Sequence, residues 1–362
     1  MAWRIEPRAE RSRALDLAAP ALAVAATIVI GSLVFSALGY DGLGAAREIF
    51  LSPLADPQRW PDLGVKSAPL VLIAVGLSFG FRANVWNIGA EGQYVVGAIA
   101  GTGVALAAYD MAGYWILPAM LVAGALGGAA YAAIPALLRT RFKVSEILSS
   151  LMLSYVALQL LYFLVRGPWR DPQGYNFPQT RTFTDWETLP AVVPGTVLHL
   201  GVPIAFLAAF LAWIVLRATV LGFEVRVVGL APAAARYAGF EADRTAWRTM
   251  LAGGAFAGLA GILEAAGPFG QLTPQFPQGY GYVAIIVAFL GRLHPLGIAL
   301  AGIVMAVSYV GGETAQTTVG LPGAAAGVFQ ALMLFCLLAV DMATRYRLRR
   351  VAPAPSAAGA RP

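Results

Sequence analysis

The sequence contains little cysteine and little histidine. Cys336 is the single cysteine among 362 residues, so no disulfide can form within the chain. His199 and His294 lie far apart, and the sequence holds no HExxH motif, no Cys/His cluster and no Walker A pattern. These absences argue against a metal site and against a chain that hydrolyses ATP by itself.

Charge is also scarce. Charged residues make up 12% of the chain and hydrophobic residues 59%, whereas a typical soluble domain has about 25% charged residues. This composition excludes a set of soluble domains, a disordered chain and a disulfide-rich secreted scaffold.

The apolar residues form long uncharged runs. A bilayer span needs about 20 apolar residues in a helix, and barrel strands would instead alternate apolar and polar positions. The sequence therefore predicts an all-α polytopic membrane protein with about ten transmembrane helices. We expect them at residues 17–38, 66–81, 88–109, 113–137, 146–165, 200–216, 249–267, 280–291, 295–311 and 321–340. The segment 280–291 is short, which indicates a broken or re-entrant helix.

The positive charges predict the orientation. If the N-terminus is cytoplasmic, only Arg47, Arg59, Lys66, Arg166, Arg170 and Arg181 of the 25 lysines and arginines fall outside, as the positive-inside rule requires. Residues 1–16 and 341–362 are then cytoplasmic tails around a transmembrane domain at 17–340. This domain has an outer loop at 166–200 and a cytoplasmic loop at 217–248. The basic residues are spread over separate loops, so we expect no nucleic-acid partner.

The first apolar run favours an uncleaved helix. Leu17–Tyr40 is longer than the roughly 7–15 apolar residues of a signal peptide. We therefore expect this segment to remain as the first membrane span.

Polar residues are concentrated in FRANVWNIGAEGQ, residues 81–93. Arg82, Asn84, Asn87, Glu91 and Gln93 lie there between two apolar helices. Polar groups at membrane depth are costly and mark functional sites. A solvated cytoplasmic turn before a capped helix would give the same pattern, and the residues alone leave both readings open.

Two further segments are informative. PAAARYAG (232–239) combines a proline suited to a first helical turn with a terminating glycine. It predicts a short helix in the cytoplasmic loop, which either docks a partner or merely connects two spans. GYGYVAIIVAFLGRLHPLG (279–297) brackets a short helix with glycines and a proline. Such a helix fits a transport pathway or close helix packing.

Five ordered motifs carry a resemblance to a known family. They are FRANVWNIGAEGQ (81–93), KVSEILSSLMLSY (143–155), GPWRDPQGYNFPQT (167–180), LGFEVRVVGLAPAAARYAGF (221–240) and GYVAIIVAFLGRLHPLG (281–297). From about Ser67 to Val340 the chain resembles permease subunits of bacterial ABC importers in the ribose/branched-chain amino-acid permease superfamily. Within it, the chain is similar to nucleoside and simple-sugar permeases that work with basic-membrane-protein-type lipoproteins.

The resemblance implies a multi-pass subunit of the bacterial inner membrane with both termini cytoplasmic. It implies no cofactor on this chain, and ATP and Mg on a separate cytoplasmic ATP-binding subunit. An external substrate-binding lipoprotein and a second, related permease complete the expected importer. The GPWxDP-like loop at 167–172 favours a heterodimer of permeases over a homodimer.

By the same resemblance, the short helix couples this chain to the ATP-binding subunit. The expected coupling residues are Pro232, Ala234, Ala235, Arg236, Tyr237 and Gly239.

For the substrate pathway we expect Asn87, Glu91 and Gln93 as polar contributors, because amides both donate and accept hydrogen bonds. Trp86 either stacks on a nucleoside base or anchors the chain at the membrane interface. The subfamily resemblance favours nucleosides as substrates, followed by simple sugars.

The alternative function is an ion-coupled secondary transporter of a small polar solute. It requires an acidic residue at mid-membrane, for which Glu264 and Glu313 are candidates. The predicted topology places both near outer helix ends, where water reaches them. A passive channel is a further alternative.

Overall fold

The apolar runs form helices in the computed structural model, which describes residues 2–7 and 13–351. The elements are β1 (Ala2–Pro7), α1 (Arg13–Ala37), α2 (Gly42–Phe50), α3 (Ser52–Ala55), η1 (Pro57–Arg59), α4 (Trp60–Arg82), α5 (Ala90–Ala107), α6 (Ile116–Phe142), α7 (Glu146–Arg166), α8 (Gly201–Ala218), α9 (Val220–Leu230), α10 (Pro232–Tyr237), α11 (Ala242–Glu264), the π-helical η2 (Ala265–Phe269), α12 (Tyr280–Leu290), α13 (Pro295–Thr318), α14 (Ala325–Arg345) and β2 (Tyr346–Val351).

All ten predicted spans correspond to a helix. Eight helices in the described part of the chain are long and apolar enough to cross a membrane. The other two predicted spans are α5, whose first turn contains Glu91 and Gln93, and α12, which has only 11 residues. The all-α prediction is thus confirmed for the membrane-spanning part, and the short helix expected at 280–291 is confirmed as well.

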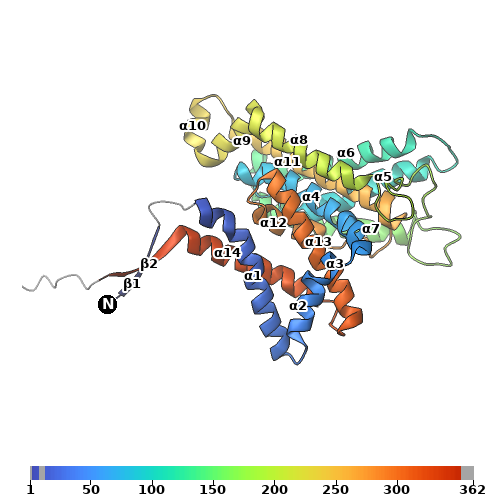
Figure 1. Ribbon diagram of the computed structural model, residues 1–362. Helices are drawn as coiled ribbons and strands as arrows, with labels where there is room; N and C mark the ends of the chain where they lie inside the picture. Colours follow the sequence, from blue (N-terminus) through green and yellow to red (C-terminus); the bar gives the residue numbers. More distant parts are fainter. Residues whose placement is uncertain (1, 8–12, 352–362) are drawn as a thin grey trace, which may run out of the picture.

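The two chain ends pair with each other as a two-stranded sheet. β1 and β2 pair antiparallel, from Ala2 opposite Val351 to Pro7 opposite Tyr346. Hydropathy gave no sign of this pair, because the two strands lie more than 300 residues apart in sequence and are not apolar. The pairing places both ends of the described chain at one end of the molecule (Figure 1). Residues 1, 8–12 and 352–362 of the predicted tails lie outside the described residues.

The core is built around α4 and α11. Every residue of α4 from Ser67 to Phe81 is buried, and α11 packs against α4, α5 and α6. The approach of α11 to α6 depends on paired GxxxG spacings, Gly124 with Gly128 and Gly254 with Gly258. A Cβ on Gly258 would lie within 3 Å of the Gly128 backbone. Small residues thus let the two backbones touch, as is common between membrane helices.

The helix contacts indicate an inverted internal repeat, which the sequence did not reveal. α5 packs on α6, α7 and α11, and α12 packs correspondingly on α13, α14 and α4. α4 ends, and α11 begins, beside α9, so the two halves run in opposite directions. α5 and α12 therefore occupy equivalent positions in the two halves.

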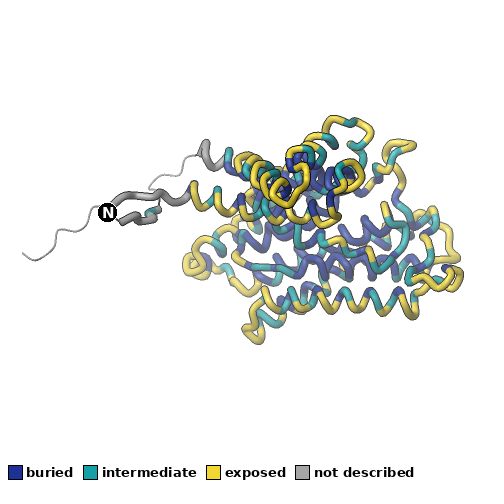
Figure 2. Tube along the Cα trace, turned by 90° about the horizontal axis from the view of Figure 1, so that it is seen from below, coloured by how far each residue is buried: buried dark blue, intermediate teal, exposed yellow. Residues whose placement is uncertain are grey.

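The two ends of the bundle carry different surfaces. α9 and α10 project from the end where the chain termini lie, and the 166–200 loop lies at the opposite end (Figure 1). Exposed residues gather at both ends, while the middle of the bundle is largely buried (Figure 2). The loops predicted to lie on opposite sides of the membrane are thus separated by the length of the helices.

Candidate functional site

The segment between α4 and α5 runs into the bundle without helical structure. Asn84 turns the chain with a φ of 57°, residues 85–89 are non-helical, and α5 starts at Ala90, two residues later than predicted. A Cβ on Gly89 would come within 2.7 Å of Ser150, so only glycine fits against α7 at this point. The site is therefore built on a helix that begins inside the protein.

Asn87 and Gln93 form a reciprocal amide pair. Asn87 Nδ2 donates to Gln93 Oε1 at 2.8 Å, and Gln93 Nε2 donates to Asn87 Oδ1 at 3.1 Å. Asn87 Oδ1 also accepts the Gly89 N–H at 3.1 Å. Both side chains are buried, so the reading of this segment as a solvated turn is wrong for these residues.

Glu91 caps the start of α12. Its Oε1 accepts the Gly279 N–H at 3.0 Å and its Oε2 accepts the Gly281 N–H at 2.6 Å. The carboxylate is 2% exposed. A helix N-terminus carries unpaired N–H groups and a partial positive charge, which a carboxylate stabilises.

The first turns of α5 and α12 meet at this carboxylate. A Cβ on Gly281 would come within 2.8 Å of the carbonyl carbon of Ala90, so the two backbones are in contact. Gly279, with a φ of 77°, lets the chain turn directly into α12. Two broken helices at equivalent positions thus point their N-termini at one buried point, an arrangement typical of substrate sites in transporters.

Trp86 lies at the edge of this site and is packed rather than free. Its ring centroid lies 5.2 Å from that of Phe81 and 5.9 Å from that of Phe289 on α12. Its indole N–H donates to Asn84 Oδ1 at 3.0 Å. Trp86 is therefore half-buried against α12.

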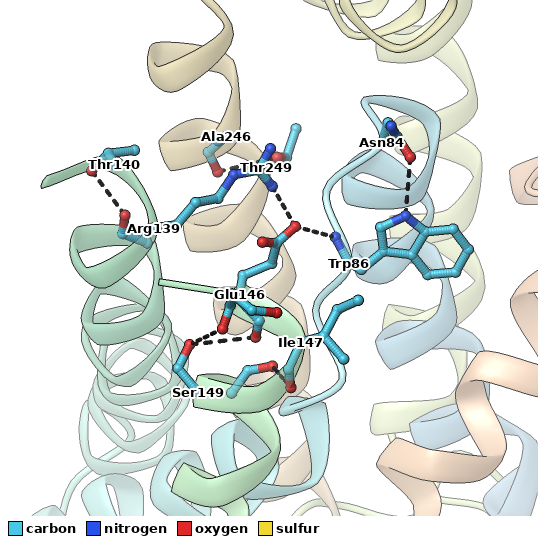
Figure 3. A network of polar contacts seen from close by, with 12 residues as sticks. Asn84, Trp86, Arg139, Thr140, Glu146, Ile147, Ser149, Ala246 and Thr249 are labelled. Carbon is cyan, nitrogen blue, oxygen red and sulfur yellow. Dashed lines mark hydrogen bonds and ion pairs between the residues drawn. The ribbon is translucent and has the colours of Figure 1, made fainter. Parts of the chain in front are cut away.

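A polar network connects Trp86 to α6 and α7 (Figure 3). The Trp86 backbone N–H donates to Glu146 Oε1 at 3.3 Å, and Arg139 Nη1 lies 2.6 Å from the same oxygen. This ion pair ties the segment before α5 to the end of α6 and the start of α7.

Sequence reasoning missed the contribution of α7. Ser150 Oγ accepts the Ile88 N–H, and Ser154 Oγ accepts the Gly92 N–H, both at 3.2 Å. The two serines are four residues apart on one face of α7. That spacing within KVSEILSSLMLSY is the signal that would have predicted a polar contact with a neighbouring helix start.

Side-chain hydrogen bonds and an ion pair hold the 217–248 segment to the bundle. On α9, the buried Glu224 accepts a hydrogen bond from Thr245 at 2.7 Å and pairs with Arg248 at 2.8 Å. Trp247 donates its indole N–H to Thr140 of α6 at 3.0 Å. These contacts fix α9 to the start of α11, and the start of α11 to the end of α6.

α10 forms as predicted, with Pro232 in its first turn and Gly239, at a φ of 86°, after its end. Ala234, Arg236 and Tyr237 are exposed, Tyr237 to 97%, whereas Ala235 is 1% exposed. The predicted coupling residues thus divide into an exposed surface and one inward-facing alanine, which packs beneath the helix.

The two acidic residues considered for ion coupling behave differently. Glu313 is exposed and lies 3.4 Å from Lys66. Glu264 is 3% exposed. The expectation that water reaches Glu264 is therefore wrong, because α11 packs against α4, α5 and α6 and its last residue is buried with it.

The outer loop braces the chain that leads into α12. Three backbone N–H groups within residues 180–189 donate to carbonyls within residues 266–272, at 2.8–3.0 Å. Arg181 pairs with the fully buried Glu187 at 3.3 Å and lies 3.2 Å from the ring centroid of Tyr109. The loop is therefore connected to both α5 and α12.

One pattern that suggests an enzymatic site has a structural role. Gly76–Gly80 matches the spacing GxSxG, but Ser78 lies in mid-helix, buried, and donates to the Val75 carbonyl at 2.7 Å. A nucleophile elbow would need a strand-to-helix turn instead. Among the described residues no group of three or more His, Cys, Asp or Glu side chains is placed to hold a metal ion.

Comparisons with known proteins agree with these features. A family model described as the branched-chain amino acid transport system permease component matches residues 62–338. The chain is 37% identical over 355 residues to the glucose ABC transporter permease protein TsgB13 of Haloferax volcanii, covering 95% of this chain and 93% of that protein. It is 28% identical over 350 residues to the guanosine ABC transporter permease protein NupP of Bacillus subtilis, covering 94% and 96%.

A third relative is the nucleoside ABC transporter permease protein NupB of Lactococcus lactis, 28% identical over 326 residues, covering 87% of this chain and 89% of that protein. A second ABC transporter permease protein from each of the three organisms also matches, over 64–69% of this chain. No solved structure matches.

Proposed function

The chain belongs to the family of branched-chain amino acid transport system permease components, and from this we propose that it forms one half of the membrane channel of an ATP-driven importer for nucleosides or simple sugars. It is a multi-pass ABC transporter permease and a transport subunit, not an enzyme, since its relatives are ABC transporter permeases. ATP hydrolysis belongs to a separate ATP-binding subunit. The family match over 62–338 is the observation that carries the proposal.

The proposed partners follow from the two ends of the bundle. The exposed face of α10 (Ala234, Arg236 and Tyr237) docks on the cytoplasmic ATP-binding subunit, which holds ATP and Mg, and this chain binds no cofactor. A substrate-binding lipoprotein delivers the solute at the 166–200 end. The end with α10 and the chain termini is cytoplasmic, because most of the arginines and lysines lie there, and the membrane is the bacterial inner membrane.

The second half of the channel is a related permease. Matches to two permease proteins from each of three organisms, one long and one shorter, support a heterodimer. In such an importer this chain corresponds to the longer partner, which carries the outer loop.

The proposed substrate class rests on the relatives and on the chemistry of the site. Glucose, guanosine and other nucleosides, named for the relatives, share a sugar ring with several hydroxyls. Carboxylate, amide and backbone N–H groups near the starts of α5 and α12 suit such hydroxyls. In the structure the side chains of Asn87, Glu91 and Gln93 form their hydrogen bonds within the protein. Opening the bundle exchanges these bonds for bonds to the passing solute, with Trp86 at the edge of the pathway.

The buried Glu264 is the observation that favours the alternative, an ion-coupled transporter. Substitution of Glu264 distinguishes an ATP-driven importer from an ion-coupled transporter. If the importer uses ATP, Glu264→Gln leaves uptake dependent on ATP and insensitive to proton or sodium gradients.

The coupling assignment is tested by co-purification with the ATP-binding subunit encoded beside its gene. Tyr237→Asp and Arg236→Glu change exposed side chains of α10 and should lower recovery of the ATP-binding subunit at least about fivefold, because they place negative charge in the interface. Arg141→Glu is the matched control, since Arg141 is exposed at the end of α6.

Ala235→Glu answers a different question. It inserts a charge beneath α10, where Ala235 is buried, and should disorder α10 itself. Full recovery of the ATP-binding subunit with both Tyr237→Asp and Arg236→Glu would contradict the coupling role of α10.

A further inference from the structure

A groove with a volume of about 860 Å³ separates α1 from the α12–α13 corner. α1 packs on α14 and α2 (Figure 1) rather than along α13. The walls of the groove are apolar: Val24 and Ile28 line one side, and Leu300 and Val304 the other.

The groove lies within the membrane-spanning part of the chain. Its α1 wall extends from Pro20 to Ile28, about 12 Å at a rise of 1.5 Å per residue, inside the apolar segment Ala18–Ala37. Ala25 on this wall and Leu300 on the other are exposed. The groove is therefore open towards the hydrocarbon of the bilayer.

One end of the groove is cationic. Arg292 and His294, in the turn between α12 and α13, line the groove there. Burial and the charge of Arg82 lower the pKa of His294, so Arg292 supplies the positive charge. Asp341 lies 3.8 Å from Arg292, whose side chain remains one-third exposed.

The turn that holds Arg292 has an unusual backbone. Arg292 and Leu293 both have positive φ, 54° and 57°, which L-residues seldom adopt in succession. Arg82 Nε donates to the Leu293 carbonyl at 2.8 Å and holds the turn in place. Such strain persists where the surrounding structure enforces it and often accompanies function.

We propose that this groove binds an anionic phospholipid, with one acyl chain between α1 and α13 and the phosphate at Arg292. The apolar walls suit an acyl chain, and guanidinium groups bind phosphate oxygens through charged hydrogen bonds. Basic pockets between helices on the cytoplasmic side of a membrane bind acidic head groups for the same reason. The proposal requires only that the chain spans a membrane, and it is independent of the transported solute.

The test is native mass spectrometry of the assembled importer, purified in detergent and titrated with phosphatidylglycerol or phosphatidylcholine. We expect one phosphatidylglycerol to be retained at least about tenfold more tightly than phosphatidylcholine. Arg292→Gln should remove this preference. Arg141→Gln, which removes the same charge from an exposed position on α6, should leave it unchanged.

Two further variants probe the groove and its acidic neighbour. Ala25→Phe fills the groove and should prevent retention of either lipid, whereas Ala130→Phe, at an exposed alanine of α6, should not. Asp341→Asn removes the carboxylate that would compete with a lipid phosphate for Arg292. This substitution should therefore strengthen phosphatidylglycerol binding.

Equal retention of the two lipids, or an unchanged preference in Arg292→Gln, would overturn the proposal. A second combination of results would also overturn the proposal: inorganic phosphate displaces phosphatidylglycerol from the wild type, and the Ala25→Phe variant still retains phosphatidylglycerol. The groove would then contribute nothing to lipid binding. If Ala25→Cys cross-links to the second permease in the intact importer, a protein helix fills the groove instead and the proposal is overturned.

Discussion

Glu91 shows how one side chain can hold a broken helix inside a membrane protein. A carboxylate buried alone in an apolar bundle would be destabilising. Here both oxygens accept backbone N–H groups at the start of α12. The charge and the helix terminus therefore stabilise one another, and the site depends on this single residue.

Replacing Glu91 tests that role. Glu91→Ala leaves the Gly279 and Gly281 N–H groups without acceptors, which should cost about 2–3 kcal/mol of stability and abolish transport. Glu91→Gln keeps one hydrogen-bond acceptor, so its stability and its uptake rate should lie between those of Glu91→Ala and those of the wild type. The readouts are thermal unfolding of the purified importer and ATP-driven uptake.

Glu241→Ala is the control, because Glu241 is exposed and makes no side-chain cap at the start of α11. An unchanged melting temperature in Glu91→Ala would contradict the capping role.

His199 gives the outer loop a pH dependence. Its Nδ1 accepts the Gly201 N–H at 3.1 Å, and its buried Nε2 faces Gly267 and finds no hydrogen-bond partner among the described residues. Burial lowers the pKa of His199 from 6.5 to about 4. The unfolded chain therefore binds a proton first, and the contribution of His199 to stability is lost as pH falls from 6.5 to about 4.

Asn keeps the acceptor but does not titrate, so His199→Asn isolates this effect. The melting temperature of the wild type should fall relative to His199→Asn as the pH is lowered from 7.5 to 4.5. If the melting temperatures of the two proteins changed in parallel with pH, His199 would not be the source of the pH dependence.

At the scale of elements, the contact between α5 and α12 depends on the absence of a side chain at Gly281. Gly281→Ala places a methyl group against the backbone of Glu91, which cannot move aside as a side chain could. The starts of α5 and α12 must then move apart, which should lower the free energy of unfolding by about 1–3 kcal/mol. ATP-driven uptake should be lost as well.

Gly327→Ala is the matched control, because among the described residues no atom outside the neighbouring backbone of α14 lies within 4 Å of the added methyl group. It should be neutral or slightly stabilising, since alanine favours helix more than glycine does. Normal uptake by Gly281→Ala would show that the two helix starts need not touch.

The positions of the elements could be predicted better than their contacts. Hydropathy located every span, because a bilayer imposes length and apolarity on each helix separately. The polarity of residues 81–93 identified Asn87, Glu91 and Gln93 as candidates. The amide pair, the cap on α12 and the burial of Glu264 depend on helices more than 100 residues away or on a non-helical segment, so no local pattern encodes them.

At the scale of the whole molecule, the inverted repeat suggests how transport occurs. α5 and α12 start at a shared point in the interior, and each is tied to one end of the bundle. The Arg139–Glu146 pair holds the segment before α5 to α6 and α7, while residues 180–189 brace the chain before α12. We propose that rocking of one half against the other opens the shared point to each side in turn.

The central claim is that this chain moves its solute only as part of an ATP-driven importer. The direct test is uptake of labelled guanosine and glucose into proteoliposomes that contain this chain, the second permease and the ATP-binding subunit, supplied with the binding lipoprotein. We predict uptake of at least one solute that requires ATP at the face bearing α10 and falls at least about tenfold without it. Uptake by this chain alone, driven by a proton or sodium gradient and lost in Glu264→Gln, would contradict the claim.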